Sequence, residues 1–471
     1  MHRIRWSGRN RLLVRCFFGV DMASQHKTLG KTYLRYLFAG LGSAVIVSIY
    51  SIVDAIMVGK YEGANGTAAL SVVMPIWTII LSLGLLFGVG GGSLMSKARG
   101  EGDEKRGREI FTVAFVCAVV VALLIWGVLL VFENSLLRLF GADETLLPLA
   151  KKYLTWMKFS MPLFTMGQFL SCFIRNDNAP TKAMAAVITG GVFNIVGDYF
   201  FVFVRDMGAE GAGLATALGQ VLAVGILVSH FFSRQNGLKF VRPEAFFRKA
   251  AAVFIAGFSV FVVDLALGVL TMLFNNQIMK YLGADALAVY GVIINVSVLV
   301  QSLSYGVGQA AQPIVSQAYG AGEKKNILRI ERYGIFSALI LGVIAFAVAE
   351  ILPLSIVRGF MKTNAAIEEI APNIFRIYAL SFLLLPANIF FTYYYQAIMR
   401  PTGALTISLV RGIFLSGLLI FLLPVFFGGA ALWWVMPVTE IFTFGIGLIF
   451  GRKYRFSSEE TKDENLAKNN D

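Results

Sequence analysis

The chain has 471 residues, of which 57% are hydrophobic and only 15% are charged, and its mean hydropathy is +0.71. About a quarter of the residues in soluble domains are charged, so this composition excludes a soluble protein. The net charge of +13 does not indicate a nucleic-acid partner, because membrane proteins hold lysine and arginine in their cytoplasmic loops. We therefore predict an all-α polytopic membrane protein that has the lipid bilayer as its surroundings and binds no nucleic acid.

Twelve apolar runs follow one another along the chain, each long enough for a transmembrane helix of roughly 20 residues. Their centres lie near residues 45, 80, 121, 164, 194, 222, 263, 297, 340, 386, 416 and 441. Basic clusters hold most of the 41 lysines and arginines, and each cluster follows an even number of spans. All of them therefore fall on the side of both termini, which is predicted to be cytoplasmic.

The N-terminal stretch 1–32 is basic, and its apolar part, Leu12 to Val20, is interrupted by Arg15 and is too short to span a bilayer. We expect a cytoplasmic tail here, not a cleavable signal peptide. The 3 cysteines form no spaced cluster, so neither a disulfide framework nor a metal site is predicted.

The second half of the chain repeats the first. A shift of 220 residues without a gap places Gly88 on Gly308, Ser96 on Ser316 and Gly100 on Gly320. The repeat contains six helices, and an even number means that both copies enter the membrane from the same side. The two lobes are thus predicted to be parallel repeats related by an axis along the membrane normal. The expected divisions are a tail 1–32, lobes 33–234 and 250–452, a cytoplasmic linker 235–249 and a cytoplasmic tail 453–471.

Polar residues inside the spans of the first lobe are the main candidates for function. Asn194 and Asp198 lie four apart in the run 186–203, so they share one helix face. At a rise of 1.5 Å per residue, Asp198 lies roughly 24 Å and Asp54 roughly 27 Å from the cytoplasmic ends of their helices, and Thr216 lies near the outer end of its own. An ionisable residue in a membrane is usually functional. The alternative is a helix-packing role.

These side chains suit a cation or a proton. Two carboxylates in a low-dielectric site repel each other, so one holds a proton or the pair binds a cation such as Na⁺. Asn194 and Thr216 add neutral oxygens.

The second lobe is less regular. Asp264, Arg411 and Glu440 lie inside predicted spans, and either acid could form a buried structural ion pair with the arginine or take part in transport. Tyr394 lies in a run of three tyrosines that is typical of an interfacial belt. The alternative is an aromatic wall for cationic substrates, to which Tyr50 of the first lobe could add.

Five stretches of the chain resemble the multidrug and toxic compound extrusion (MATE) family, and the resemblance runs from about residue 30 to 452. They are VDAIMVGKYEG, FIRNDNAPTKAM, FNIVGDYFFVF, GAEGAGLATALGQ and AAQPIVSQAYGAGE. The resemblance implies a bacterial-type inner membrane.

It also implies a cation or proton site at Asp54, Asn194, Asp198 and Thr216, with Gln168 as a weaker candidate for the same cavity. Some family members carry a second-lobe acid on the tenth helix. This chain has no such acid between residues 373 and 399.

We therefore predict an antiporter that exports amphipathic, often cationic compounds by alternating access, coupled to H⁺ or Na⁺, with no cofactor and no obligate protein partner. The alternative transport function is a flippase for a lipid-linked precursor. Catalytic motifs such as H-E-x-x-H, G-x-S-x-G and the Walker-type loop are absent from the sequence. An enzyme is therefore not predicted, since an intramembrane transferase would need clustered catalytic side chains.

Overall fold

The structure is a computed structural model that describes residues 9–361 and 363–467. Eleven of the described helical segments are long and apolar enough to cross a membrane. The twelfth long segment is α3, of 31 residues, which carries lysines near its start and Arg175 near its end. These segments confirm the prediction of an all-α membrane protein.

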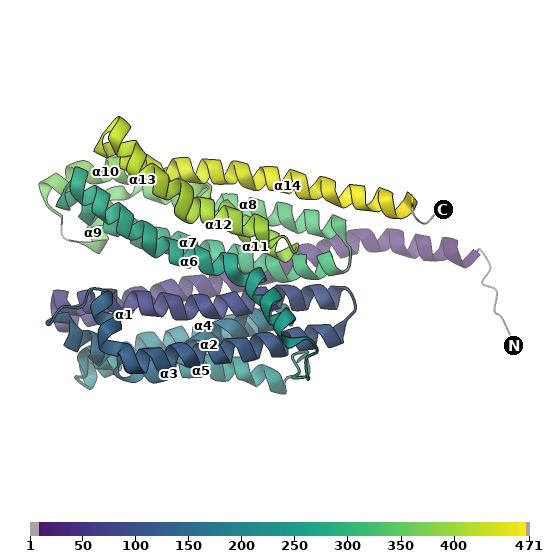
Figure 1. Cartoon of the computed structure of the whole chain (residues 1–471), viewed down its shortest axis with the longest axis horizontal. Helices are drawn as coiled ribbons and strands as arrows, with labels where there is room; N and C mark the ends of the chain where they lie inside the picture. The colour runs from purple at the N-terminus through teal and green to yellow at the C-terminus, as the bar shows by residue number, and fades with distance from the viewer. Residues whose placement is uncertain (1–8, 362, 468–471) are drawn as a thin grey trace.

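The helices form two layers in Figure 1, α1 to α5 in one and α6 to α14 in the other. The first lobe contains α1 (Arg9–Gly100), α2 (Glu104–Leu139), α3 (Leu146–Asn176), α4 (Pro180–Asp198) with the π-helical η1 (Tyr199–Val204), α5 (Gly208–Val228) and η2 (Ser229–Phe232). The second lobe contains α6 (Phe246–Tyr281), α7 (Ala284–Gly320), α8 (Lys324–Ile351), α9 (Pro353–Phe360), α10 (Ala365–Ala379), η3 (Leu380–Leu383), α11 (Leu385–Ala397), α12 (Pro401–Leu409), η4 (Val410–Phe414), α13 (Leu415–Phe427), η5 (Gly429–Trp434) and α14 (Val435–Ala467).

The ends of the elements differ from the sequence prediction in three places. α1 begins at Arg9, so the backbone of much of the expected N-terminal tail is helical. α6 begins at Phe246, inside the expected linker 235–249. α14 ends at Ala467, so the backbone of most of the expected tail 453–471 is helical as well. Residues 1–8 and 468–471, the outer parts of the two expected tails, lie outside the described residues.

Glycines with positive φ show that the repeat extends to backbone conformation. Gly63 (φ 70°) reverses the chain between the two spans of α1, and Gly283 (φ 85°) does so between α6 and α7. Gly102 (φ 83°) and Gly322 (φ 71°) precede α2 and α8 in the same way. Each pair differs by 220 residues. Only glycine adopts this region without steric cost, which explains why the repeat keeps glycine there.

The two lobes pack against each other at the end that carries the basic loops 97–108 and 324–332, here called the basic-loop end. A Cβ atom on Gly100 would lie 2.1 Å from the carbonyl oxygen of Gln317, and a Cβ on Gly320 would lie 2.0 Å from that of Lys97. The 220-residue shift converts one contact into the other, because it places Gly100 on Gly320 and Lys97 on Gln317. The lobes therefore meet around a pseudo-twofold axis, as expected for parallel repeats.

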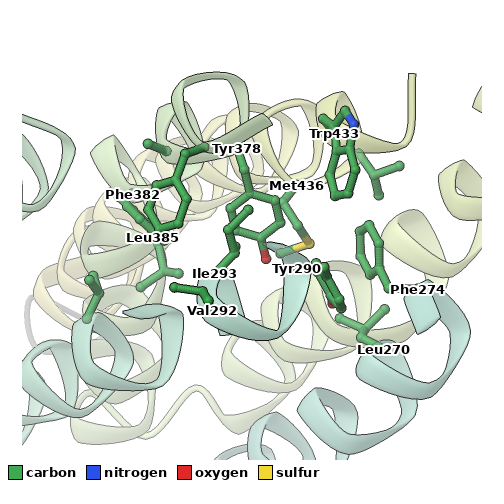
Figure 2. Packing of buried hydrophobic residues seen from close by; sticks show 14 of the residues in the cluster. Leu270, Phe274, Tyr290, Val292, Ile293, Tyr378, Phe382, Leu385, Trp433 and Met436 are labelled. Atoms are coloured by element: carbon green, nitrogen blue, oxygen red, sulfur yellow. The ribbon is translucent and has the colours of Figure 1, made fainter. Parts of the chain in front are cut away.

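Apolar clusters fill the interior of each lobe and also cross between the lobes, since Cys172 of α3 belongs to the second-lobe cluster and Val253 of α6 to a first-lobe cluster. In the second lobe, Figure 2 shows aromatic side chains from several helices around Tyr290 of α7. The ring of Phe274 in α6 stacks on Tyr290 with centroids 5.0 Å apart, and Trp433 of η5 lies 6.4 Å away. Such packing makes each lobe a stiff unit. When the lobes move relative to each other, the contacts between them therefore change.

Replacing Gly320 with valine should separate the lobes at the basic-loop end, because its side chain would collide with backbone at Lys97, which cannot move aside cheaply. We expect the distance between spin labels at exposed positions 104 and 325 to increase. Gly225→Val is the control, since nothing lies within 4 Å of a Cβ there. Unchanged label distances in Gly320→Val would contradict the proposed packing.

Candidate functional site

Asp54 lies in the first span of α1 and is 8% exposed. The hydroxyl of Tyr153, on α3, donates a hydrogen bond of 2.8 Å to its Oδ2. Sequence reasoning missed Tyr153, because a tyrosine near the end of a span resembles an interfacial residue. The contact fixes α1 against α3 at the position of Asp54.

Asn194 and Asp198 lie one turn apart on α4, as predicted, and both are buried. The Asn194 side-chain amide donates to the Thr216 hydroxyl on α5 at 2.9 Å and to Asp198 Oδ1 at 3.4 Å. The amide therefore joins the two helices and orients both neighbours.

The two groups form one cluster. Asp54 and Asp198 interact electrostatically, and the Tyr153 hydroxyl interacts with Thr216 as well as with Asp54. Three buried oxygens in the cluster, Asp54 Oδ1, Asn194 Oδ1 and Asp198 Oδ2, have no hydrogen-bond partner among the residues that the structure describes. Buried oxygens of this kind are acceptors for a proton or ligands for a hard cation. The structure thus brings all four predicted residues together.

A small cavity of about 60 Å³ extends from this cluster, here called the first-lobe cavity. Its polar lining residues are Tyr50, Gln168, Ser171, Asn194, Thr216 and Gln220. The volume holds a few water molecules, whereas pockets for drug-sized ligands measure about 300 Å³ or more. The cavity is therefore too small for a drug-sized ligand, and Gln168 lines it as expected.

The second-lobe residues form two separate sites. Arg411 Nε lies 2.7 Å from Glu440 Oε1, and Asn388 donates to the other oxygen of Glu440 at 2.6 Å. Asp264 lies apart from them and accepts from Ser82 of the first lobe at 2.8 Å and from Tyr305 at 2.5 Å. Of the two pairs considered, Arg411 forms the one with Glu440.

The tyrosine run of α11 is buried, so the interfacial-belt interpretation is wrong. Tyr393, Tyr394 and Tyr395 are 1%, 5% and 0% exposed. The Tyr394 hydroxyl donates to Glu331 at 3.2 Å and the Tyr395 hydroxyl to the carbonyl of Gly447 at 2.5 Å. The Tyr394 and Tyr395 rings are accommodated in the interior of the second lobe because their hydroxyl groups find partners there.

Comparison with known sequences matches most of the chain to one family. The family model MatE matches residues 39–200 and 249–422. The multidrug export protein MepA of Staphylococcus aureus (strain MRSA252) is 25% identical over 402 residues, covering 83% of this chain and 86% of MepA. MepA of Staphylococcus saprophyticus is 24% identical over 409 residues, covering 85% and 88%.

Solved structures share the fold. A MATE-family transporter of the MOP superfamily in an outward-facing conformation aligns with a TM-score of 0.85 at 18% identity, over 92% of this chain and 97% of that one. A MOP-superfamily transporter from Pyrococcus furiosus, described as having a binding pocket of reverse polarity, aligns with a TM-score of 0.84 at 18% identity, over 90% and 96%.

Replacing Arg411 with methionine should destabilise the protein by about 3–5 kcal/mol, because it leaves the fully buried Glu440 carboxylate without its cation. The double variant Arg411→Met with Glu440→Leu should recover most of that loss. The measurement is thermal unfolding of purified protein in detergent. A single variant as stable as wild type would contradict a structural ion pair.

Proposed function

Because the chain belongs to the MATE family of multidrug efflux transporters and is an integral membrane protein, not an enzyme, we propose that it is an antiporter coupled to H⁺ or Na⁺. The observation that carries this proposal is the buried cluster of Asp54, Asn194, Asp198 and Thr216 beside the first-lobe cavity. Two buried carboxylates, each with one oxygen that has no hydrogen-bond partner among the described residues, are costly in a membrane unless a proton or cation occupies them part of the time.

The proposed coupling acts through α1. A proton or Na⁺ entering the cluster changes the charge at Asp54, whose carboxylate accepts from Tyr153. This change alters how the first span of α1 packs on α3. An ion that binds one arrangement better than the other shifts the populations of the two conformations by its differential affinity.

The packing of the lobes supports an outward-facing conformation. Cross-lobe hydrogen bonds run from Tyr33–Ser337 at the basic-loop end to Ser82–Asp264 near the middle of the second span of α1. With the basic loops and both termini in the cytoplasm, as the charge distribution predicts, the contacts close the cytoplasmic side. The first-lobe cavity is too small for a drug, so we place export of amphipathic, often cationic compounds between the lobes.

The test is dye export from proteoliposomes that contain purified protein, with a proton or a Na⁺ gradient imposed separately. We expect export under one gradient, and Asp198→Asn should reduce it at least about tenfold because the amide cannot exchange a proton or neutralise a cation. Asp206→Asn is the matched control, because Asp206 is exposed and bonded to Tyr61 outside the cluster.

Normal gradient-driven export by Asp198→Asn would refute the coupling role. Absence of export by folded wild type under both gradients would refute the antiporter and make lipid-linked substrates the next assay.

A further inference from the structure

Arg175, near the end of α3, is a buried cation without an acidic partner. It is 6% exposed. Its Nη2 donates to the Ser171 hydroxyl at 2.8 Å, and its Nη1 donates to Gln309 on α7 of the other lobe. Among the described residues, no carboxylate lies within 4.0 Å of it to form an ion pair.

This lack of a partner is unusual for a buried charge. Arg411, the other arginine buried in the spans, has Glu440 at 2.7 Å. Asp177 lies two residues after Arg175, but its oxygens accept from Arg99 and His230, each at 2.7 Å. The positive charge of Arg175 is therefore not neutralised by a neighbouring acid.

The titratable groups that interact electrostatically with the Arg175 side chain are the Cys172 thiol and the Tyr393 hydroxyl, which are both neutral at ordinary pH, and the nearby amides are neutral too. On its own helix, Asn176 donates to the carbonyl of Cys172 at 2.8 Å. Across the lobe contact, Gln312 donates to the Ser93 hydroxyl at 2.8 Å. The carboxyl end of α3 adds only the partial negative charge of a helix terminus, which helps to keep the guanidinium in place.

Arg175 lies directly beyond the end of the first-lobe cavity. Ser171, its hydrogen-bond partner, lines that cavity together with Asn194 and Thr216 of the acid cluster. From Asn194 the cavity runs along α4 to Val187, which is roughly 10 Å at the helical rise. Arg175 thus lies one helical turn beyond Ser171 toward the basic-loop end, with its guanidinium bonded to this lining residue.

We propose that Arg175 is an electrostatic barrier that stops the coupling cation from leaking through the first-lobe cavity to the basic-loop end while the lobes are packed there. This inference rests on the proposed function. Because arginine keeps its charge under all ordinary conditions, it repels H₃O⁺ and Na⁺ alike. Fixed positive groups exclude cations from membrane pores in the same way.

The bond to Gln309 makes the barrier dependent on conformation. It joins the two lobes at the face where they pack, so separating the lobes at the basic-loop end removes one of the two partners that hold the guanidinium. Arg175 is then free to move away from the cavity. The barrier is closed in one conformation and released in the other, as alternating access requires.

The test measures cation entry into proteoliposomes without any drug, under a proton gradient and under a Na⁺ gradient, with fluorescent reporters of internal pH and Na⁺. Arg175→Met removes the charge at similar volume, and we expect it to raise the entry rate of the coupling cation several-fold over wild type. Arg175→Lys keeps the positive charge, so its rate of cation entry should equal that of wild type. Gln309→Leu removes the cross-lobe bond but keeps the charge, and should leak less than Arg175→Met.

Two further variants test the same barrier independently. Ser171→Asp places a carboxylate beside the guanidinium, so it should also raise cation entry, and it tests the idea if Arg175→Met is not recovered folded. Adding Asp198→Asn to Arg175→Met should lower the leak again if the ion passes the acid cluster.

Gradient-driven dye export by wild type in the same vesicles keeps this test separate from that of the proposed function. Leak in Arg175→Met without wild-type export supports the barrier and refutes the antiporter. Folded Arg175→Met and Ser171→Asp that are both as tight as wild type overturn the barrier.

Discussion

The free-energy cost of placing a charge in a low-dielectric interior is the constraint on which the rest of the structure depends. The chain meets it in three ways. Glu440 is neutralised by Arg411 and held by Asn388. Asp264 has no cation but accepts from two hydroxyl groups. The first-lobe acids are less well satisfied, since one oxygen each of Asp54 and Asp198 has no hydrogen-bond partner in the described part of the chain, and incomplete satisfaction is what an exchangeable ion requires.

The contact between the lobes is built on a different principle, which is close approach of backbones. Gly40 on α1 and Gly306 on α7 would each collide with the other if either carried a side chain. Small residues allow dense packing without a hydrophobic driving force, which lipid does not provide. Such a contact forms and separates without rearranging large side chains, so it suits lobes that rock as stiff units.

Much of the fold and of the first-lobe site could be predicted because both depend on spacing along one chain. Twelve apolar runs, a constant shift of 220 residues and the four-residue interval of Asn194 and Asp198 are visible in the sequence alone. Depth along each helix then placed Asp54 beside them. Contacts that depend on how one helix is rotated against another could not be predicted. Tyr153 with Asp54 and Arg175 with Gln309 are of this kind.

Helix rotation also explains the failure at the tyrosine run. Three consecutive residues point in different directions around a helix, so an interfacial position would leave some of them facing protein. All three are buried because α11 is surrounded by packed neighbours. Tyr305 lies against Tyr393, Phe390 against Tyr394 and Phe391 against Tyr395. Composition alone could not show that the helix is enclosed.

The acid cluster and the contact between the lobes share a single helix. The first span of α1, Thr28–Gly63, carries Asp54 toward one end and Gly40 toward the other, roughly 21 Å apart at the helical rise. Asp54 contacts Tyr153 within its own lobe, while Gly40 lies against Gly306 of the opposite lobe. In the proposed coupling, a change of charge at Asp54 tilts this span, and the helix carries the tilt along its length to the lobe contact. Such a coupling needs no chain of intermediate residues, only the stiffness of one span.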